Sequence, residues 1–242
     1  MQLLVHTFLT QKIQQCRSQR EKKLLDRMQV NLLVGGPVDH LPPGLLQAKK
    51  NERWVGADMG AVRLCQAKIK PLLAVGDFDS ATAEQVKLVT EASQAICSLP
   101  AKKDYTDTEV ALLEIERRYH PEQIVVYGAT GGRSDHFLAN LFSVLRLDFP
   151  TFVPKVCFKD CQNEIRFYLP GSYTLTKLEE MSYLSFISLT PVTKLTLPDE
   201  KYQLFEQDLS LPTAYVSNEF VGESASFSFD SGVLCVIQSI DS

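Results

Sequence analysis

The chain has 242 residues, of which 45% are hydrophobic and 22% are charged, as in an ordinary globular protein with one large or two smaller domains. Its formal net charge of -4 disfavours a general nucleic-acid binder, which would carry a basic surface. No apolar run approaches the roughly 18 residues that span a bilayer, so we expect neither a nucleic-acid nor a membrane partner.

The N-terminal stretch and the cysteines both bear on the cellular compartment. Residues 1–27 lack strand or helix periodicity, and their apolar part has no basic segment before it and no small-residue cleavage site after it. We therefore expect a dispensable N-terminal extension rather than a secretory signal. The six cysteines include no Cys-x-x-Cys pair, which favours reduced thiols in a cytoplasmic protein over a zinc site.

Residues 28–150 alternate short apolar runs with longer amphipathic stretches. The runs are nearly all apolar, as in strands that are covered on both faces. The predicted strands are residues 30–34, 54–57, 72–75, 95–98 and 124–127. Apolar residues at helical spacing predict helices near residues 81–88, 110–117 and 135–147. This alternation predicts an α/β domain with a doubly wound, mainly parallel sheet and helices on both faces.

Polar residues follow nearly every predicted strand. They are Gly35 and Gly36 after the first strand, Asp58 after the second, Asp77 and Asp79 after the third, Asp104 a few residues beyond the fourth, and residues 128–133 after the fifth. The carboxyl ends of parallel strands meet at one edge of a sheet, where open α/β sheets bind ligands. The sequence therefore predicts one site, with carboxylates for a metal ion and glycines and an arginine for phosphate.

Asp77 and Asp79 are predicted metal ligands. If the backbone between them is extended, both carboxylates point to the same side, where one magnesium ion can bind both. The structural alternative is a turn in which Ser80 caps the following helix. We expect Ser80 to be that cap, but one cap does not account for two neighbouring carboxylates.

Residues 103–109, Lys-Asp-Tyr-Thr-Asp-Thr-Glu, combine a helix start with further carboxylates. Thr106 and Glu109 have the spacing of a capping box, in which each side chain bonds the other residue's backbone N–H. That role leaves Asp104 and Asp107 unexplained. We expect at least one of these two to serve the metal or the substrate.

The segment Gly-Ala-Thr-Gly-Gly-Arg at 128–133 follows the fifth strand and precedes a helix. Glycine lets backbone amides approach phosphate oxygens, so we expect Gly131 and Gly132 to line a phosphate site. Arg133 adds a planar, permanently charged group. Ser134 is the expected N-cap of the next helix, and His136 either contacts the substrate or packs locally.

Residues 151–242 change to an alternating pattern of apolar and polar residues without helical periodicity. The predicted strands are residues 165–169, 173–175, 183–189, 194–197, 224–229 and 233–237. Pro-Gly at 170–171 and Asp-Ser-Gly at 230–232 are typical turn sequences. We expect this second domain to be an antiparallel β-sandwich.

Several segments together resemble the thiamine pyrophosphokinase family. They are Gly-Asp-Phe-Asp-Ser at 76–80, Asp-Tyr-Thr-Asp-Thr-Glu at 104–109 and the segment 128–141 that begins Gly-Ala-Thr-Gly-Gly-Arg-Ser-Asp-His. In the second half, Val-Ser-Asn-Glu-Phe at 216–220 and the stretch 159–171 are similar to the family's β domain. The resemblance covers about residues 28–242 and rests on the order and combination of the motifs.

This resemblance implies a homodimeric thiamine diphosphokinase that binds Mg-ATP in the α/β domain and thiamine in the β-sandwich domain, near the subunit interface. The implied reaction moves the diphosphoryl group of ATP to the thiamine hydroxyl, which attacks the β-phosphorus and releases AMP. By position, the resemblance assigns the magnesium and phosphate site to Asp58, Asp77, Asp79 and Asp104, substrate orientation or proton acceptance to Asp107 and Asp135, the ATP phosphate to Arg133, and thiamine to Ser217, Asn218 and the ring of Tyr202.

Two other functions stay open from the residues alone. An Asp-x-Asp motif after a strand also suits a metal-dependent nucleotide-sugar transferase. A regulator that binds thiamine or a nucleotide without turnover would need only the binding residues.

Overall fold

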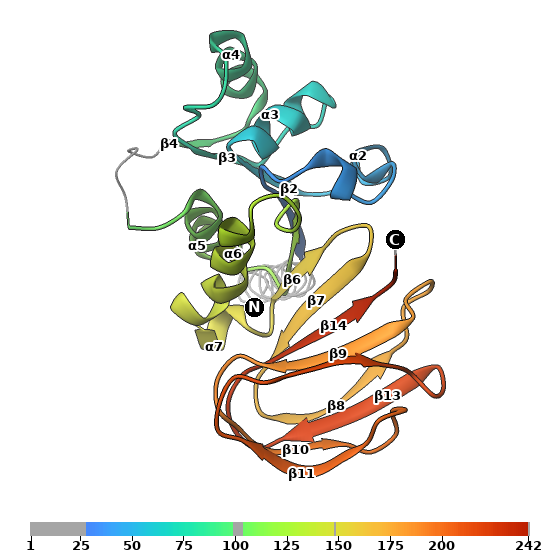
Figure 1. Cartoon of the computed structure of the whole chain (residues 1–242). Coiled ribbons are helices and arrows are strands. Elements are labelled where there is room, and N and C mark those ends of the chain that lie inside the picture. Colours follow the sequence, from blue (N-terminus) through green and yellow to red (C-terminus); the bar gives the residue numbers. More distant parts are fainter. Residues whose placement is uncertain (1–27, 99–103, 148, 242) are drawn as a thin grey trace, which may run out of the picture.

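The computed structural model describes residues 28–98, 104–147 and 149–241. The expected N-terminal extension, residues 1–27, therefore lies outside the described residues. Figure 1 shows a sheet flanked by helices and, beyond it, a region built from strands alone. Within the described part of the chain, no helix has the length and apolarity needed to traverse a bilayer.

The N-terminal region is built on parallel strands, as predicted. They are β1 (Gln29–Leu33), β2 (Trp54–Ala57), β3 (Leu73–Gly76), β4 (Ile96–Ser98), β5 (Gln123–Tyr127) and β6 (Val156–Lys159). Their order is β6-β5-β1-β2-β3-β4, so the chain runs from β1 to one edge and then returns to the other side of β1. This reversal places the topological switch point between β1 and β5.

Helices cover both faces of this sheet, which confirms the doubly wound prediction. One face packs against α2 (Leu45–Ala48), α3 (Met59–Gln66) and α4 (Ala83–Ala92), and a short 3-10 turn η1 (Val38–His40) follows β1. The other face packs against α5 (Asp107–Tyr119), α6 (Ser134–Arg146) and α7 (Phe149–Phe152). Of these elements, α2, α3, α7 and β6 were not anticipated from the sequence.

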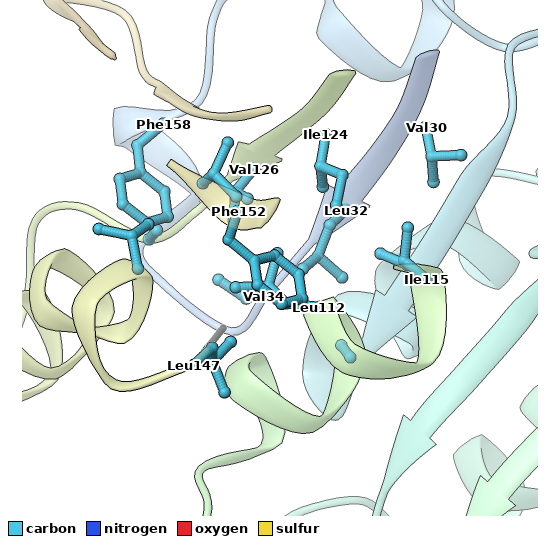
Figure 2. Packing of buried hydrophobic residues seen from close by; sticks show 14 of the residues in the cluster. Val30, Leu32, Val34, Leu112, Ile115, Ile124, Val126, Leu147, Phe152 and Phe158 are labelled. Atoms are coloured by element: carbon cyan, nitrogen blue, oxygen red, sulfur yellow. The ribbon is translucent and has the colours of Figure 1, made fainter. Parts of the chain in front are cut away.

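The core on the α5–α6–α7 side fixes the position of the strands. Val30 and Leu32 of β1 point toward Leu112 and Ile115 of α5 (Figure 2), and all four side chains are fully buried. Each such burial contributes roughly 1.5–3 kcal/mol. The ring of Phe152, which follows the predicted domain boundary at 150, packs into this same cluster. The core therefore continues past that boundary.

The C-terminal strands are antiparallel and form the expected sandwich. They are β7 (Asn163–Tyr168), β8 (Gly171–Thr176), β9 (Tyr183–Ser188), β10 (Val192–Leu197), β11 (Leu204–Leu209), β12 (Ala214–Asn218), β13 (Ser224–Phe229) and β14 (Leu234–Ser239). One layer is the sheet β11-β10-β13-β8. The other, β12-β9-β14-β7, pairs through β7 with β6 and so extends the parallel sheet to ten strands. The strands β11 and β12 were not anticipated.

The predicted Ser80 cap is wrong. Thr82 caps α4 instead: its Oγ1 accepts a hydrogen bond from Gln85 N at 3.3 Å, and Gln85 Oε1 accepts one from Thr82 N at 2.9 Å. The helix begins two residues late because residues 78–81 form a turn, in which Ala81 N donates to the Phe78 carbonyl. The Ser80 hydroxyl donates to Asp79 Oδ1 at 3.0 Å.

The predicted Ser134 cap is also wrong, whereas the Thr106–Glu109 capping box is confirmed. Ser134 is the first residue inside α6, and Arg133 before it makes no side-chain cap. Thr106 Oγ1 accepts from Glu109 N at 3.2 Å, and Glu109 Oε2 accepts from Thr106 N at 2.8 Å. A complete reciprocal motif thus located a helix start, where a lone serine did not.

Candidate active site

A cavity of about 560 Å³ opens beside the carboxyl ends of β1, β2 and β5, at the topological switch point. Its lining includes the predicted residues Gly35, Gly36, Asp58, Asp107, Gly131, Gly132, Arg133 and His136. Its size lies within the range of small-molecule sites. Asp77, Asp79, Asp104 and Asp135 do not form part of its wall. The structure thus brings together the glycine loops and two of the predicted carboxylates.

The two glycine segments meet each other directly at this cavity. Gly36 N donates to the Gly128 carbonyl oxygen at 3.0 Å, and a Cβ on Gly36 would lie 2.1 Å from that oxygen. Gly36 is therefore required by the close approach of two backbones. Asn140 of α6 fixes the second loop, because its buried Nδ2 donates to the Ala129 carbonyl at 3.0 Å.

Asp58 occupies a strained position between β2 and α3. Its backbone angles of φ 46° and ψ -120° are unusual for a non-glycine residue, and such strain concentrates at functional sites. Its Oδ1 lies over Gly76, where a Cβ would come within 2.0 Å of that atom. The absence of a side chain at Gly76 thus makes room for the carboxylate of Asp58.

Carboxylates cluster around Asp58. The pKa of Asp58 is raised to about 7. The largest cause is burial, followed by the negative charge of Asp107 and a hydrogen bond between the Asp58 and Asp107 side chains, and the charge of Asp77 raises it further. Asp58 Oδ1 is buried and has no hydrogen-bond partner in the described structure. Such an acidic cluster fits a hard divalent cation such as Mg²⁺. As the described side chains stand, however, no three Asp, Glu, His or Cys converge on a single metal position.

The structure separates Asp77 from Asp79. The expected extended backbone between them is wrong, because Phe78 has a φ of 55° and Asp79 N turns back to donate to Asp77 Oδ1 at 3.3 Å. Asp77 is half-buried and contributes to the field at Asp58, whereas Asp79 is exposed. Asp77 is thus the member of the pair that adjoins the cavity carboxylates.

Asp104 lies at the start of the segment that leads into α5, and its side chain is exposed. Arg146 of α6 holds this segment in place. Its guanidinium donates to the Asp104 carbonyl, pairs with the buried Glu109 at 2.8 Å and lies 4.6 Å above the centre of the Tyr105 ring. Arg146 therefore fixes the backbone that delivers Asp107 to the cavity.

Arg133, which lines the cavity, forms a two-pronged ion pair with Asp135. Arg133 Nε and Nη2 donate to the two carboxylate oxygens of Asp135 at 3.1 and 2.6 Å. The bond from Arg133 lowers the pKa of Asp135 to about 2. A carboxylate of such low pKa is a weak proton acceptor near pH 7. In this arrangement the guanidinium of Arg133 already donates two hydrogen bonds to Asp135.

Sequence reasoning missed Arg63, which also lines the cavity. It lies on α3, and its guanidinium donates to the carbonyl oxygens of Gly35 and Gly36. Burial lowers its pKa. No local motif distinguishes Arg63 from an ordinary surface arginine, so only the fold reveals where it points.

The predicted thiamine residues Ser217, Asn218 and Tyr202 lie apart from this cavity, whereas His136, for which the sequence left a substrate contact open, lines it. Ser217 is exposed, has a φ of 58° and lines a second cavity of about 530 Å³ with Tyr183 and Ser185. Asn218 is buried, and its amide bonds the backbone N and O of Tyr202 at 2.9 and 2.8 Å. Asn218 thus positions the segment that presents the exposed ring of Tyr202.

Comparison with known proteins agrees with this arrangement. The family model for the thiamin pyrophosphokinase catalytic domain matches residues 46–153, and the model for the vitamin B1 binding domain of the same family matches residues 172–234. The thiamine pyrophosphokinase of Bacillus subtilis is 36% identical over 215 residues, which are 88% of this chain and 99% of that protein.

Solved structures give the same result. A thiamin pyrophosphokinase family protein from Enterococcus faecalis is 42% identical and superposes with a TM-score of 0.83, covering 88% of this chain and all of that one. A protein from Lactobacillus plantarum is 46% identical, with a TM-score of 0.81 over 89% of this chain and all of that one. The chain therefore belongs to the thiamin pyrophosphokinase family.

Proposed function

We propose that the 560 Å³ cavity binds Mg-ATP and that the chain, a thiamine diphosphokinase, transfers the diphosphoryl group of ATP to the thiamine hydroxyl. The observation that carries this proposal is the meeting of two glycine loops with the Asp58–Asp107 pair at the topological switch point. Positioning and charge neutralisation are what phosphoryl transfer requires of a protein. The matches reported above favour neither a nucleotide-sugar transferase nor a non-catalytic regulator.

The metal proposal follows from the acidic cluster. Asp58 and Asp77 would hold magnesium, with Asp107 beside them and Asp79 and Asp104 at the rim. Bound magnesium would neutralise charge on the phosphate oxygens. Support comes from the unpartnered Asp58 Oδ1, which a cation would satisfy.

The proposed reaction forms one bond and breaks one. The hydroxyl oxygen of thiamine attacks the β-phosphorus, the bond from that phosphorus to the oxygen of the α-phosphate breaks, and AMP leaves. The hydroxyl proton must move to a nearby base. Asp107 suits this role better than Asp135, because it lines the cavity, whereas the ion pair with Arg133 makes Asp135 a weak base.

We propose a homodimer whose active site lies near the subunit interface. Ser217 and Tyr202 do not line the nucleotide cavity within one chain, so a second copy would bring the two substrates together. Large apolar side chains are exposed on β11, β12 and the adjoining loops, where a partner could cover them: Tyr202, Phe205, Leu211, Val216 and Val221. The described cysteines are all free thiols, which supports a cytoplasmic location.

The decisive experiment is product analysis of the full chain with ATP, magnesium and thiamine. We expect AMP and thiamine diphosphate in equal amounts, and no AMP when thiamine is omitted. Formation of ADP would mean transfer of a single phosphate and would contradict the mechanism.

Asp77→Asn should reduce turnover at least about a hundredfold by removing a carboxylate from the metal cluster. Asp79→Asn is the comparison that decides whether the site extends to the rim.

A further inference from the structure

Arg63 joins α3 to the turn that follows β1. Its Nη1 donates to the Gly36 carbonyl at 2.5 Å, and its Nη2 donates to the Gly35 carbonyl at 3.3 Å. The guanidinium has further N–H groups, and these have no acceptor among the described residues. Because Arg63 also lines the cavity, these N–H groups remain available to a ligand.

The positive charge of Arg63 is not balanced within the described part of the chain. No Asp or Glu side chain there forms an ion pair with it, and burial is the sole cause that shifts its pKa. Arg133, the other arginine of the cavity wall, differs because Asp135 already binds it through two hydrogen bonds. A half-buried cation without a partner favours the binding of an anion.

The position of Arg63 indicates which part of a nucleotide it meets. Asp58 immediately precedes α3, and Arg63 follows about one and a half turns later on the same helix. Arg63 therefore lines the cavity from the helix that starts directly after Asp58, one of the carboxylates proposed to hold magnesium. Magnesium held by those carboxylates would supply charge neutralisation for the phosphate oxygens of the diphosphoryl group that is transferred. The anion that reaches Arg63 should then be the diphosphate that is transferred, not the phosphate that stays in AMP.

We propose that Arg63 binds the transferred diphosphate of ATP while it holds the Gly35–Gly36 turn. This inference rests on the proposed nucleotide function of the cavity. The structural alternative is that Arg63 only braces the turn. The two roles predict different effects when Arg63 is replaced. If Arg63 only braces the turn, the affinity for every ligand of the cavity falls alike. If Arg63 binds the diphosphate, the affinity for ATP falls and the affinity for AMP stays intact.

Titration calorimetry without thiamine tests the proposal on the full chain in the presence of magnesium. The probes are ATP, AMP and inorganic triphosphate, and the variant is Arg63→Gln. We expect the affinity for ATP and for inorganic triphosphate to fall at least about tenfold, which corresponds to the loss of one charge-assisted hydrogen bond, while AMP affinity changes less than about twofold. Lys68→Gln is the matched control, because it removes one exposed charge just after α3.

Each other outcome overturns the proposal in an identifiable way. An equal loss of AMP affinity would show that Arg63 only braces the turn, and unchanged triphosphate affinity would show that it does not contact phosphate. Wild-type protein that binds no ATP would overturn the proposed function as well. If Arg63→Gln fails to fold, Arg63→Lys replaces it, because lysine keeps the charge but lacks the planar fork, and the same selective loss is expected.

Discussion

Glu200 is an acidic residue buried outside the proposed nucleotide site. Its backbone forms a β-bridge with Phe220. Its Oε2 accepts a hydrogen bond from the backbone N of Asp199 at 3.2 Å, and Oε1 has no partner in the described structure. Burial raises the pKa of Glu200 from 4.5 to about 7. Between those pH values the Glu200 side chain is protonated in the folded state and ionised in the unfolded state, so the contribution of Glu200 to stability falls as pH rises from about 4.5 to about 7.

Replacement of Glu200 by glutamine should remove this pH dependence. Above pH 7 we expect Glu200→Gln to raise the free energy of unfolding by about 3 kcal/mol at most, with little change at pH 4.5. Urea denaturation of both proteins at pH 5 and pH 8 measures the difference. The exposed Glu223→Gln is the control. An equal effect of Glu200→Gln at both pH values would contradict the assigned pKa.

At the scale of elements, the two helix starts differ in whether a side chain caps them. Both sides of the Thr106–Glu109 box are formed at the start of α5, whereas Ser134 makes no cap at the start of α6. Thr106→Ala should therefore lower the free energy of unfolding by about 1 kcal/mol. Ser134→Ala should leave it unchanged within about 0.5 kcal/mol. Thermal denaturation compares the two variants, and equal destabilisation would contradict the predicted difference between the capping box and the uncapped serine.

Elements with a complete local pattern could be predicted from the sequence. The strand 54–57 was predicted at its observed bounds, because Trp54 and Val55 begin an apolar run that is buried on both faces. By contrast, β11 was missed because four of its six side chains are exposed and only Leu209 is buried, so neither alternation nor an apolar run marks it. Local pattern thus predicts the strands that build the core, whereas among the edge strands it finds β4 and β8 and misses β11 and β12.

The same distinction applies to the candidate site. Residues that follow strands, such as Asp58 and Gly36, could be placed because sheet topology brings strand ends together. Arg63 could not, because its role depends on how α3 packs against the turn after β1. The extended backbone expected around Phe78 failed for a related reason: a positive φ at a non-glycine residue has no marker in sequence.

At the scale of the whole molecule, the residues proposed to bind the two substrates lie at different places: the nucleotide residues line the 560 Å³ cavity, and Ser217 lines the second cavity. If a second copy completes each site, chains that are defective in different cavities should rescue one another. Asp77→Asn and Ser217→Ala, each poorly active alone, should regain about a quarter of wild-type activity after mixing and subunit exchange, because about half of the dimers are mixed and each holds one intact site. Activity assays with light scattering measure both properties. A monomeric protein, or no rescue, would contradict the shared site.

The position of β14 has a consequence for biosynthesis. This strand follows all other described strands in the sequence but lies between β7 and β9 in the sheet, bonded to both. During vectorial synthesis, β7 and β9 must keep open edges until residue 239 has left the ribosome, and open edges invite pairing with other chains. The slot in the sheet thus exists from the synthesis of β9 until β14 is complete, and chaperone dependence should be greatest in that interval.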